Sequence, residues 1–163
     1  MPDFRKVLFV VRHAHRVVTD RSLDNGLSER GRAQAQAAAL HIHKILGPKP
    51  ALLKSSPRLR CIETLEPLAK LLGCSVEIDP ALCEQENNET EAAFIKRIET
   101  ARDEWIQKGA DRLVVCSHGD WIPHFCELSF SQRVSLDKGG LIEAKLAGET
   151  PVLFEVRQKL DGR

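Results

Sequence analysis

The chain has 163 residues, 42% of them hydrophobic, with 24 lysines and arginines against 23 aspartates and glutamates. This length allows one sizeable core but is short for two ordinary domains, so we expect a single domain over residues 1–163. The near-zero net charge gives no reason to expect nucleic acid or an anionic membrane surface as the main partner.

The apolar and cysteine-containing segments add two further expectations. The apolar run at residues 7–11 is only five residues long and leads directly into Arg12, far too short for a signal or transmembrane segment, so we expect a soluble, cytoplasmic protein. The five cysteines are odd in number and form no Cys-x-x-Cys pair, which argues against a disulfide framework or a thiolate zinc site. We expect buried free thiols.

The first third of the chain alternates short apolar runs with a helical pattern. Residues 6–11 form a continuous β-branched and aromatic run, typical of a strand covered on both faces. Ser28 is a suitable N-cap for a helix over residues 29–46, which Gly47 and the proline after it would end. Residues 51–54 predict a second strand.

The second helix is expected to follow that strand almost at once. Ser56 can cap it and Pro57 can occupy its first turn, and its apolar positions continue to Leu72. Pro67 should kink or interrupt this helix. Residues 75–78 predict a third strand.

The remaining elements continue the alternation and end in a hairpin. Asn88 and Glu91 resemble a capping pair before a helix whose apolar stripe runs from Phe94 to Trp105. Residues 112–116 predict a fourth strand and residues 121–128 a further helix. Two final strands, at residues 141–146 and 152–156, flank a connection rich in turn residues.

Strands that alternate with helices predict a three-layer α/β/α sandwich with a mostly parallel central sheet. In such folds ligands bind beyond the carboxyl ends of the strands. Two histidine-containing segments follow predicted strands: Arg12-His-Ala-His-Arg16 after the first, and Ser117-His-Gly-Asp120 after the fourth. The first is a local basic cluster in a nearly neutral chain, which suits an anion such as phosphate.

Arg60 supports the same interpretation. It falls in the first turn of a predicted helix, where the helix dipole disfavours a cation and a bound anion would resolve the conflict. Taken alone, Arg58 or Arg60 could equally be an ordinary surface side chain.

Five motifs in order make the chain resemble the histidine phosphatase (phosphoglycerate mutase-like) superfamily. Arg12-His13 matches the family's Arg-His-Gly signature, and Ser117-His118-Gly119 its second-histidine motif. Residues 26–34 resemble its Leu-Thr/Ser-x-x-Gly-x-x-Gln-Ala helix start, residues 55–60 its Ser-x-x-x-Arg segment, and residues 82–84 its Leu-x-Glu element. Together they cover residues 7 to about 120.

The resemblance implies a phosphatase that needs neither metal nor cofactor. His13 would attack phosphorus and become transiently phosphorylated, while Arg12, Arg60 and His118 hold the phosphoryl oxygens. Arg16 matches the Arg-His-Gly-x-Arg form of the acid phosphatase and phytase branch and would be a further phosphate clamp. A neutral imidazole is a good nucleophile, and cationic neighbours both keep it unprotonated and neutralise the transferring group.

The general acid is expected to be Glu84, which occupies the Leu-x-Glu position, with Glu86 and Asp120 as competitors. The sequence departs from the family pattern at two positions. Ala14 replaces the usual glycine and disfavours a positive φ, although its small size could be tolerated. His15 stands where many relatives carry an acidic residue, and we assign it no catalytic role.

Several alternatives stay open at this point. His13 and His15 could together bind a metal, but the hydrolases built that way need a barrel of about 250 residues. A non-catalytic phosphate-binding module and a phosphoglycerate mutase-type phosphotransferase also fit the motifs. The substrate is expected to be a phosphorylated small molecule or a phosphoprotein, and the sequence predicts neither the choice between them nor the oligomeric state.

Overall fold

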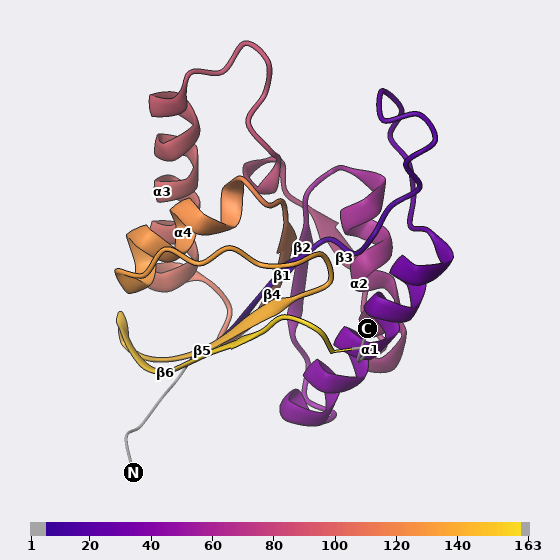
Figure 1. Cartoon of the computed structure of the whole chain (residues 1–163). Coiled ribbons are helices and arrows are strands. Elements are labelled where there is room, and N and C mark those ends of the chain that lie inside the picture. Colours follow the sequence, from indigo (N-terminus) through magenta and orange to yellow (C-terminus); the bar gives the residue numbers. More distant parts are fainter. Residues whose placement is uncertain (1–5, 161–163) are drawn as a thin grey trace.

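The computed structural model describes residues 6–160, which form a six-stranded sheet between two layers of helices (Figure 1). The strands are β1 (Lys6–Arg12), β2 (Leu52–Ser55), β3 (Val76–Ile78), β4 (Arg112–Ser117), β5 (Leu141–Ala147) and β6 (Thr150–Arg157). The helices are α1 (Glu29–Leu46), α2 (Leu59–Leu72), α3 (Glu91–Lys108), α4 (Trp121–Phe130) and the short 3-10 helix η1 (Pro80–Leu82). The predicted three-layer α/β/α fold is confirmed.

The sheet has the strand order β3-β2-β4-β1-β5-β6. Neighbouring strands from β3 to β1 run parallel, whereas β5 and β6 are antiparallel and form the predicted terminal hairpin. Because β1 and β4 are adjacent and parallel, they end at the same edge, where Arg12 pairs with Ser117. The two histidine-containing segments are therefore brought together by the central pair of strands.

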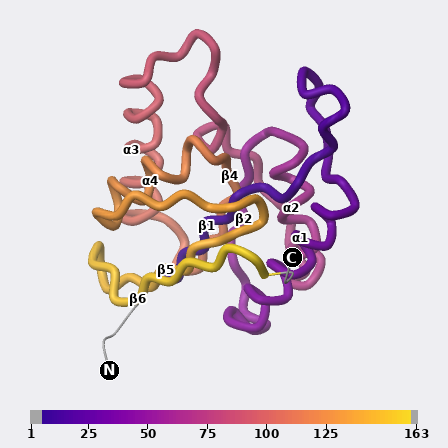
Figure 2. Tube along the Cα trace, viewed as in Figure 1, coloured from indigo at the N-terminus to yellow at the C-terminus, as the bar shows by residue number. Residues whose placement is uncertain are grey.

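Each face of the sheet has its own apolar core. Leu8 and Val10 pack with the α3 and α4 side, while Phe9 and Val11 pack with the α1 and α2 side. Figure 2 traces the two helix pairs on opposite sides of the strands. Successive side chains of a strand point to opposite faces, so a central strand covered on both sides must be apolar throughout.

The first helix has the bounds that the sequence predicts. The Ser28 side chain accepts a hydrogen bond from the Gly31 backbone N–H at 3.1 Å, and Gly47 ends the helix with a φ of 66°. Local capping and a residue free to adopt positive φ thus define both ends.

The second helix corrects two expectations. It begins at Leu59 with Arg58 as its N-cap, so Ser56 and Pro57 both precede the helix. The Ser56 hydroxyl accepts from the Arg58 N–H at 3.3 Å and lies 2.8 Å from Nε2 of His118. Pro67 does not interrupt the helix, which continues to Leu72. Pro67 and Glu63, whose carbonyl loses its helical partner, both lie on a partly exposed face where water can replace the missing hydrogen bond.

The third helix begins later than its predicted capping pair. Thr90 is the N-cap, and its side chain accepts from the Ala93 N–H at 3.1 Å, so the assignment to Asn88 was wrong. The intervening Glu89 is instead paired with Arg97 of the helix, and residues 83–90 contain a turn in which the Glu89 N–H donates to the Glu86 carbonyl at 3.0 Å. Of the five free cysteines only Cys74 is not fully buried. None of the helices within residues 6–160 is long and apolar enough to cross a bilayer.

Candidate active site

Two buried histidines meet at the carboxyl edge of β1 and β4. His13 directly follows β1, and its backbone N–H donates to the Ser117 carbonyl at 3.0 Å. His118 directly follows β4, and the two ring centroids are 5.4 Å apart. Only 6% of His13 and 3% of His118 are exposed, so the pair is largely removed from bulk water.

His13 has the protonation state of a nucleophile. Its Nδ1 lies 2.9 Å from the Ala14 carbonyl, which can only accept, so Nδ1 carries the proton and Nε2 keeps its lone pair. Burial lowers the pKa of His13 to about 3 against the opposing effect of this hydrogen bond, and the charges of His118, Arg60 and Arg12 lower it further. The ring is therefore neutral near pH 7.

His118 has the opposite character. Its Nδ1 is 2.9 Å from Oε2 of Glu84 and its Nε2 is 2.8 Å from Oγ of Ser56, so both nitrogens have an acceptor. Burial lowers the pKa of His118, but its contacts with Cys61 and Glu84 outweigh burial and raise that pKa to about 9. A cationic imidazole thus lies beside a neutral one.

Glu84 is the centre of an ion-pair network. Its carboxylate accepts hydrogen bonds from Nε of Arg58 and from Nη2 of Arg60, the latter at 2.7 Å, in addition to His118. Burial raises the pKa of Glu84, but hydrogen bonds to His118 and Arg58 and the charge of Arg60 hold it well below its usual range. Within this network Glu84 is ionised, and its carboxylate accepts hydrogen bonds rather than donating them.

The two competing carboxylates lie nearby with other partners. Asp120 accepts from the Gln85 N–H at 3.0 Å, which fastens the segment that carries Glu84. Glu86 is half exposed, 3.7 Å from Nη2 of Arg58, and its Oε1 lies 3.2 Å from Sγ of Cys83. Within residues 6–160, neither side chain forms a hydrogen bond or an ion pair with His13 or His118.

Two arginines present unsatisfied donors at the site. Nη1 of Arg12 donates to the Leu136 carbonyl at 2.6 Å, but its Nε is buried and has no partner among the described residues; the same is true of Nε of Arg60. A Cβ at Gly119 would lie 2.8 Å from Cζ of Arg12, so the glycine leaves room for the guanidinium. A buried donor without a partner is costly, and an oxyanion would satisfy it.

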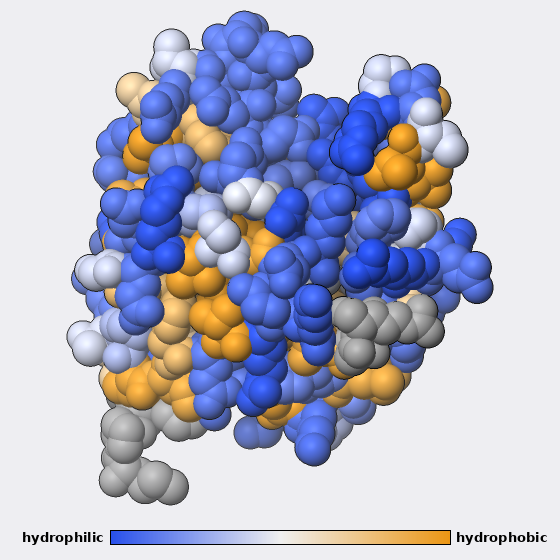
Figure 3. Space-filling model, viewed as in Figure 1, coloured by the Kyte–Doolittle hydropathy of each residue, from blue (hydrophilic) through white to orange (hydrophobic). Residues whose placement is uncertain are grey.

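Arg16 lies beside the ion-pair network of Glu84. It shares a cavity of about 310 Å³ with Arg58, Arg60 and Glu84, beneath the protruding loop that contains Asp24. Figure 3 shows a hydrophilic surface between this loop and the segment at residues 83–90, the two projections at the top of the view. Of the predicted phosphate ligands, Arg16 and Arg60 line this cavity, and Nη2 of Arg60 lies 3.4 Å from Nδ1 of His118. Arg12 lines a neighbouring cavity, and its charge acts on His13.

Sequence reasoning missed two side chains that shape this region. Thr64 accepts from the Ala14 N–H at 3.0 Å and donates to the Arg60 carbonyl at 2.6 Å, joining the nucleophile segment to α2. Arg58 donates a hydrogen bond from Nε to the Glu84 carboxylate, a contact that the sequence does not predict. The spacing of Thr64, one helical turn after Arg60, places the two residues on the same face of α2. The sequence does not predict its contact with Ala14, because Ala14 is 50 residues away in the chain.

The two departures from the family pattern have simple structural outcomes. Ala14 is buried against Leu27 and Ala35, and its φ is not positive, so its methyl group is accommodated. His15 contacts Oγ of Ser28 through Nδ1 at 2.6 Å, whereas His13 contacts the Ala14 carbonyl. Within residues 6–160 no group of three or more His, Cys, Asp or Glu side chains is arranged to hold a metal ion.

Comparisons with known proteins agree on family and fold. Residues 8–91 match the model of the histidine phosphatase superfamily (branch 1), while no curated protein matches the chain. Among solved structures, the mycobacterial glucosyl-3-phosphoglycerate phosphatase complexed with VO3 superposes with a TM-score of 0.70 and 20% identity, covering 93% of this chain and 97% of that one.

Two further structures have the same fold. The protein histidine phosphatase SixA complexed with tungstate gives a TM-score of 0.74 at 16% identity, covering 94% of this chain and 97% of that one. Phosphoserine phosphatase from Entamoeba histolytica, in complex with 3-phosphoglyceric acid, gives 0.74 at 16% identity, covering 96% and 98%. At these identities the likeness establishes the fold.

Proposed function

The chain belongs to branch 1 of the histidine phosphatase superfamily, and we propose that it is a metal-independent phosphatase that hydrolyses a phosphomonoester or phosphoprotein through a phosphohistidine on His13. One observation carries the proposal. A neutral imidazole with a free Nε2 lies beside a cationic one, near two arginines whose buried Nε donors have no partner within residues 6–160. This arrangement suits a nucleophile that attacks a dianionic group.

In the first step Nε2 of His13 forms a bond to phosphorus while the bond from phosphorus to the leaving oxygen breaks. Arg12, Arg16, Arg60 and His118 neutralise the three peripheral oxygens as negative charge spreads over them. The leaving oxygen takes a proton as it departs, and we assign this proton to Glu84.

Glu84 must gain that proton when substrate binds. A phosphoryl group between the histidines competes for Arg60 and His118, which stabilise the ionised form of Glu84, and brings negative charge near the carboxylate. Both changes raise the pKa of Glu84 and favour its protonation. In the second step the carboxylate accepts a proton from water, the water oxygen bonds to phosphorus, and the bond to His13 breaks, releasing phosphate.

The test is hydrolysis of p-nitrophenyl phosphate in the presence of EDTA by the wild type, His13→Ala and the control His43→Ala, which changes a histidine near the opposite end of α1. We expect turnover in the wild type and the control only. Mass spectrometry after alkaline quenching should detect one phosphoryl group on the wild type. Activity in His13→Ala would exclude the mechanism, and inhibition by EDTA would exclude metal independence.

The remaining alternatives give different results in the same experiment. A phosphate-binding module would bind tungstate in calorimetry without turning over any phosphomonoester. A phosphotransferase of the mutase type would pass the phosphoryl group from His13 to an added alcohol in preference to water.

A further inference from the structure

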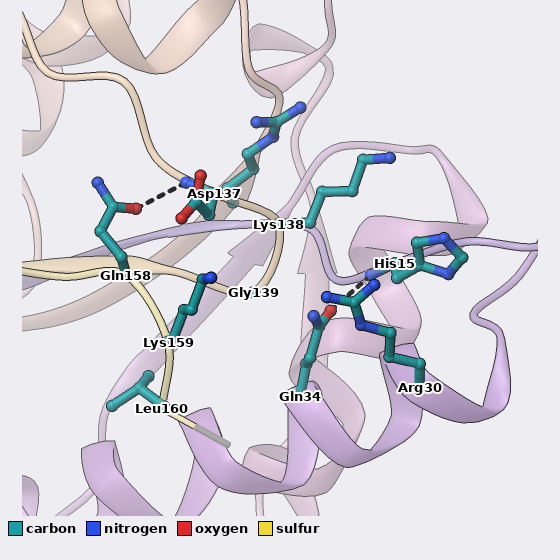
Figure 4. A pocket seen from close by; sticks show the side chains of 10 residues that line it. His15, Arg30, Gln34, Asp137, Lys138, Gly139, Gln158, Lys159 and Leu160 are labelled. Atoms are coloured by element: carbon teal, nitrogen blue, oxygen red, sulfur yellow. Dashed lines mark hydrogen bonds between the residues drawn. The ribbon is translucent and has the colours of Figure 1, made fainter. Parts of the chain in front are cut away.

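A second cavity, of about 390 Å³, adjoins the proposed phosphate site and is separate from the one that contains Glu84. It lies between the start of α1, the segment at residues 137–139 and the segment at residues 158–160 that follows β6, and Arg12 forms part of its wall. Figure 4 shows Lys138, Arg30 and His15 on one side of this space and Gln158 and Lys159 on the other.

The cavity is lined by cations that have little to balance them. The side chains of Arg30, Lys138 and Lys159 form no hydrogen bond or ion pair with any other residue in the range 6–160, and among these residues Asp137 is the single carboxylate in the lining. Burial lowers the pKa of Lys138, and the like charges of Arg12, Arg21, Arg16 and Arg30 lower it further. Cations held close together repel one another, and a bound anion removes that repulsion.

Neutral groups in the cavity add hydrogen-bond donors. Gln34 is only 7% exposed, and its Oε1 accepts from the His15 N–H at 2.8 Å, which leaves the two amide protons on its nitrogen free. Figure 4 shows this nitrogen turned away from His15. Arg30 lies in the first turn of α1, where the helix dipole disfavours a cation without an anionic partner.

The backbone fixes this cavity relative to the nucleophile. The N–H of Gly139 lies 3.2 Å from the carbonyls of both Arg12 and His13, so the segment with Lys138 is tied to the end of β1. Gly139 has a φ of 79°, and a Cβ there would lie 2.9 Å from Cβ of Gln34, so the close approach needs glycine. Lys138 is therefore held next to the reacting centre rather than on a free loop.

The other cavity offers less capacity for a second anion. There Arg58 and Arg60 are already paired with Glu84, and Asp24 is a second carboxylate in a lining that also holds Arg16 and Arg21. The cavity beside Lys138 has the same number of arginines and lysines but, among the described residues, only one carboxylate, Asp137. We propose that the cavity between α1 and residues 137–139 binds a second anionic group of the substrate, through Lys138 and Arg30. This inference rests on the proposed function and assigns the substrate class: a phosphomonoester that also carries a carboxylate or a second phosphate.

Two matched ligand pairs test the proposal by calorimetry. The first pair is 3-phosphoglycerate and glycerol 3-phosphate, which differ by one carboxylate; the second is glucose 1,6-bisphosphate and glucose 6-phosphate, which differ by one phosphate. In a His13→Ala background, which prevents turnover, we expect the more anionic member of at least one pair to bind about tenfold more tightly, as one or two charge-assisted hydrogen bonds predict. The ratio of kcat/KM values in otherwise wild-type protein gives the same comparison without relying on that variant.

Lys138→Gln and Arg30→Gln should each remove most of this preference while leaving the affinity for the less anionic member within about twofold. The control Lys49→Gln changes an exposed lysine between α1 and β2, at the opposite edge of the sheet, and should retain the preference. Equal affinities within both pairs, or a preference that survives both substitutions, would overturn the second anion site. If the protein with His13 intact shows no turnover but still prefers the more anionic ligand through Lys138 and Arg30, the second anion site is supported. Only the proposed hydrolysis is then refuted.

Discussion

The two histidines of the site are the same residue type with opposite protonation states, and their immediate partners explain why. The Ala14 carbonyl can only accept, and burial disfavours a charge on His13. His118 is equally buried, but a carboxylate and a hydroxyl accept from its two nitrogens. The contacts of His118 with Cys61 and Glu84 therefore outweigh the desolvation that both rings share.

Glu84→Gln should lower the pKa of His118 from about 9 by roughly one to three pH units, because the amide removes the negative charge that stabilises the imidazolium. An NMR titration of the ring protons measures this directly, with His118→Gln used to assign the resonance. Glu86→Gln is the matched control, since Glu86 has no contact with His118, and it should leave the titration unchanged. An unaltered pKa in Glu84→Gln would mean that another group holds the proton.

At the scale of elements, the segment that carries Glu84 is held by α3. Nη1 of Arg97 donates to the carbonyls of Ala81 and Cys83, each at 2.9 Å, and Nη2 donates to the Glu84 carbonyl at 3.2 Å. The same guanidinium pairs with Glu89. Arg97 is thus a positioning residue for Glu84, because a segment without regular structure takes its shape from these hydrogen bonds.

Arg97→Ala should free residues 83–90, lower kcat by about tenfold or more and reduce the free energy of unfolding by about 1–3 kcal/mol. Hydrogen exchange should accelerate in this segment specifically, a change that general destabilisation would not confine to it. Lys96→Ala removes an exposed cation one position earlier on α3 and should have no such effect. Unchanged exchange at residues 83–90 in Arg97→Ala would argue against the positioning role.

At the scale of the whole molecule, a nearly neutral chain concentrates its unusual charges at one edge of the sheet. The net charge is +1, yet in both cavities at that edge the arginines and lysines of the lining outnumber the carboxylates. The same edge holds His13 and His118, whose pKa values differ from the ordinary 6.5 in opposite directions. The stability of the fold is therefore linked to pH through the site.

The free energy of unfolding should be greatest near pH 6.5. As the pH falls from 6.5 towards 3, His13 is protonated in the unfolded state but stays neutral in the folded state, so the free energy of unfolding decreases. The lowered pKa of Glu84 has the same effect at the acid end of this range. Between pH 6.5 and 9, His118 is protonated in the folded state but not in the unfolded state. The free energy of unfolding therefore decreases again as the pH rises through this range.

Urea denaturation across this pH range measures both limbs. His13→Ala should flatten the acid limb and His118→Gln the alkaline limb, with the other limb retained in each case. A profile that has the same shape in all three proteins would contradict the assignment of these two groups.

The sequence by itself determined the features that depend on neighbouring residues. Ser28 and Gly47 define α1 because capping is local, and the apolar run of β1 predicts a central strand because its alternate side chains must fill two cores. The order of the motifs indicated His13 and His118, and the parallel topology that follows from alternating elements places both at one edge.

The tertiary structure decided what depends on partners distant in the chain. The Ser56 hydroxyl contacts Nε2 of His118, which is 62 residues later in the chain, and α2 begins at Leu59 with Arg58 as its N-cap. Thr90 caps α3 in place of Asn88, and Arg97 of that helix pairs with the intervening Glu89. The ionised state of Glu84 and the cavity beside Lys138 likewise require side chains from separate elements. Burial and charge pairing are properties of the folded neighbourhood, so no pattern along the chain contains them.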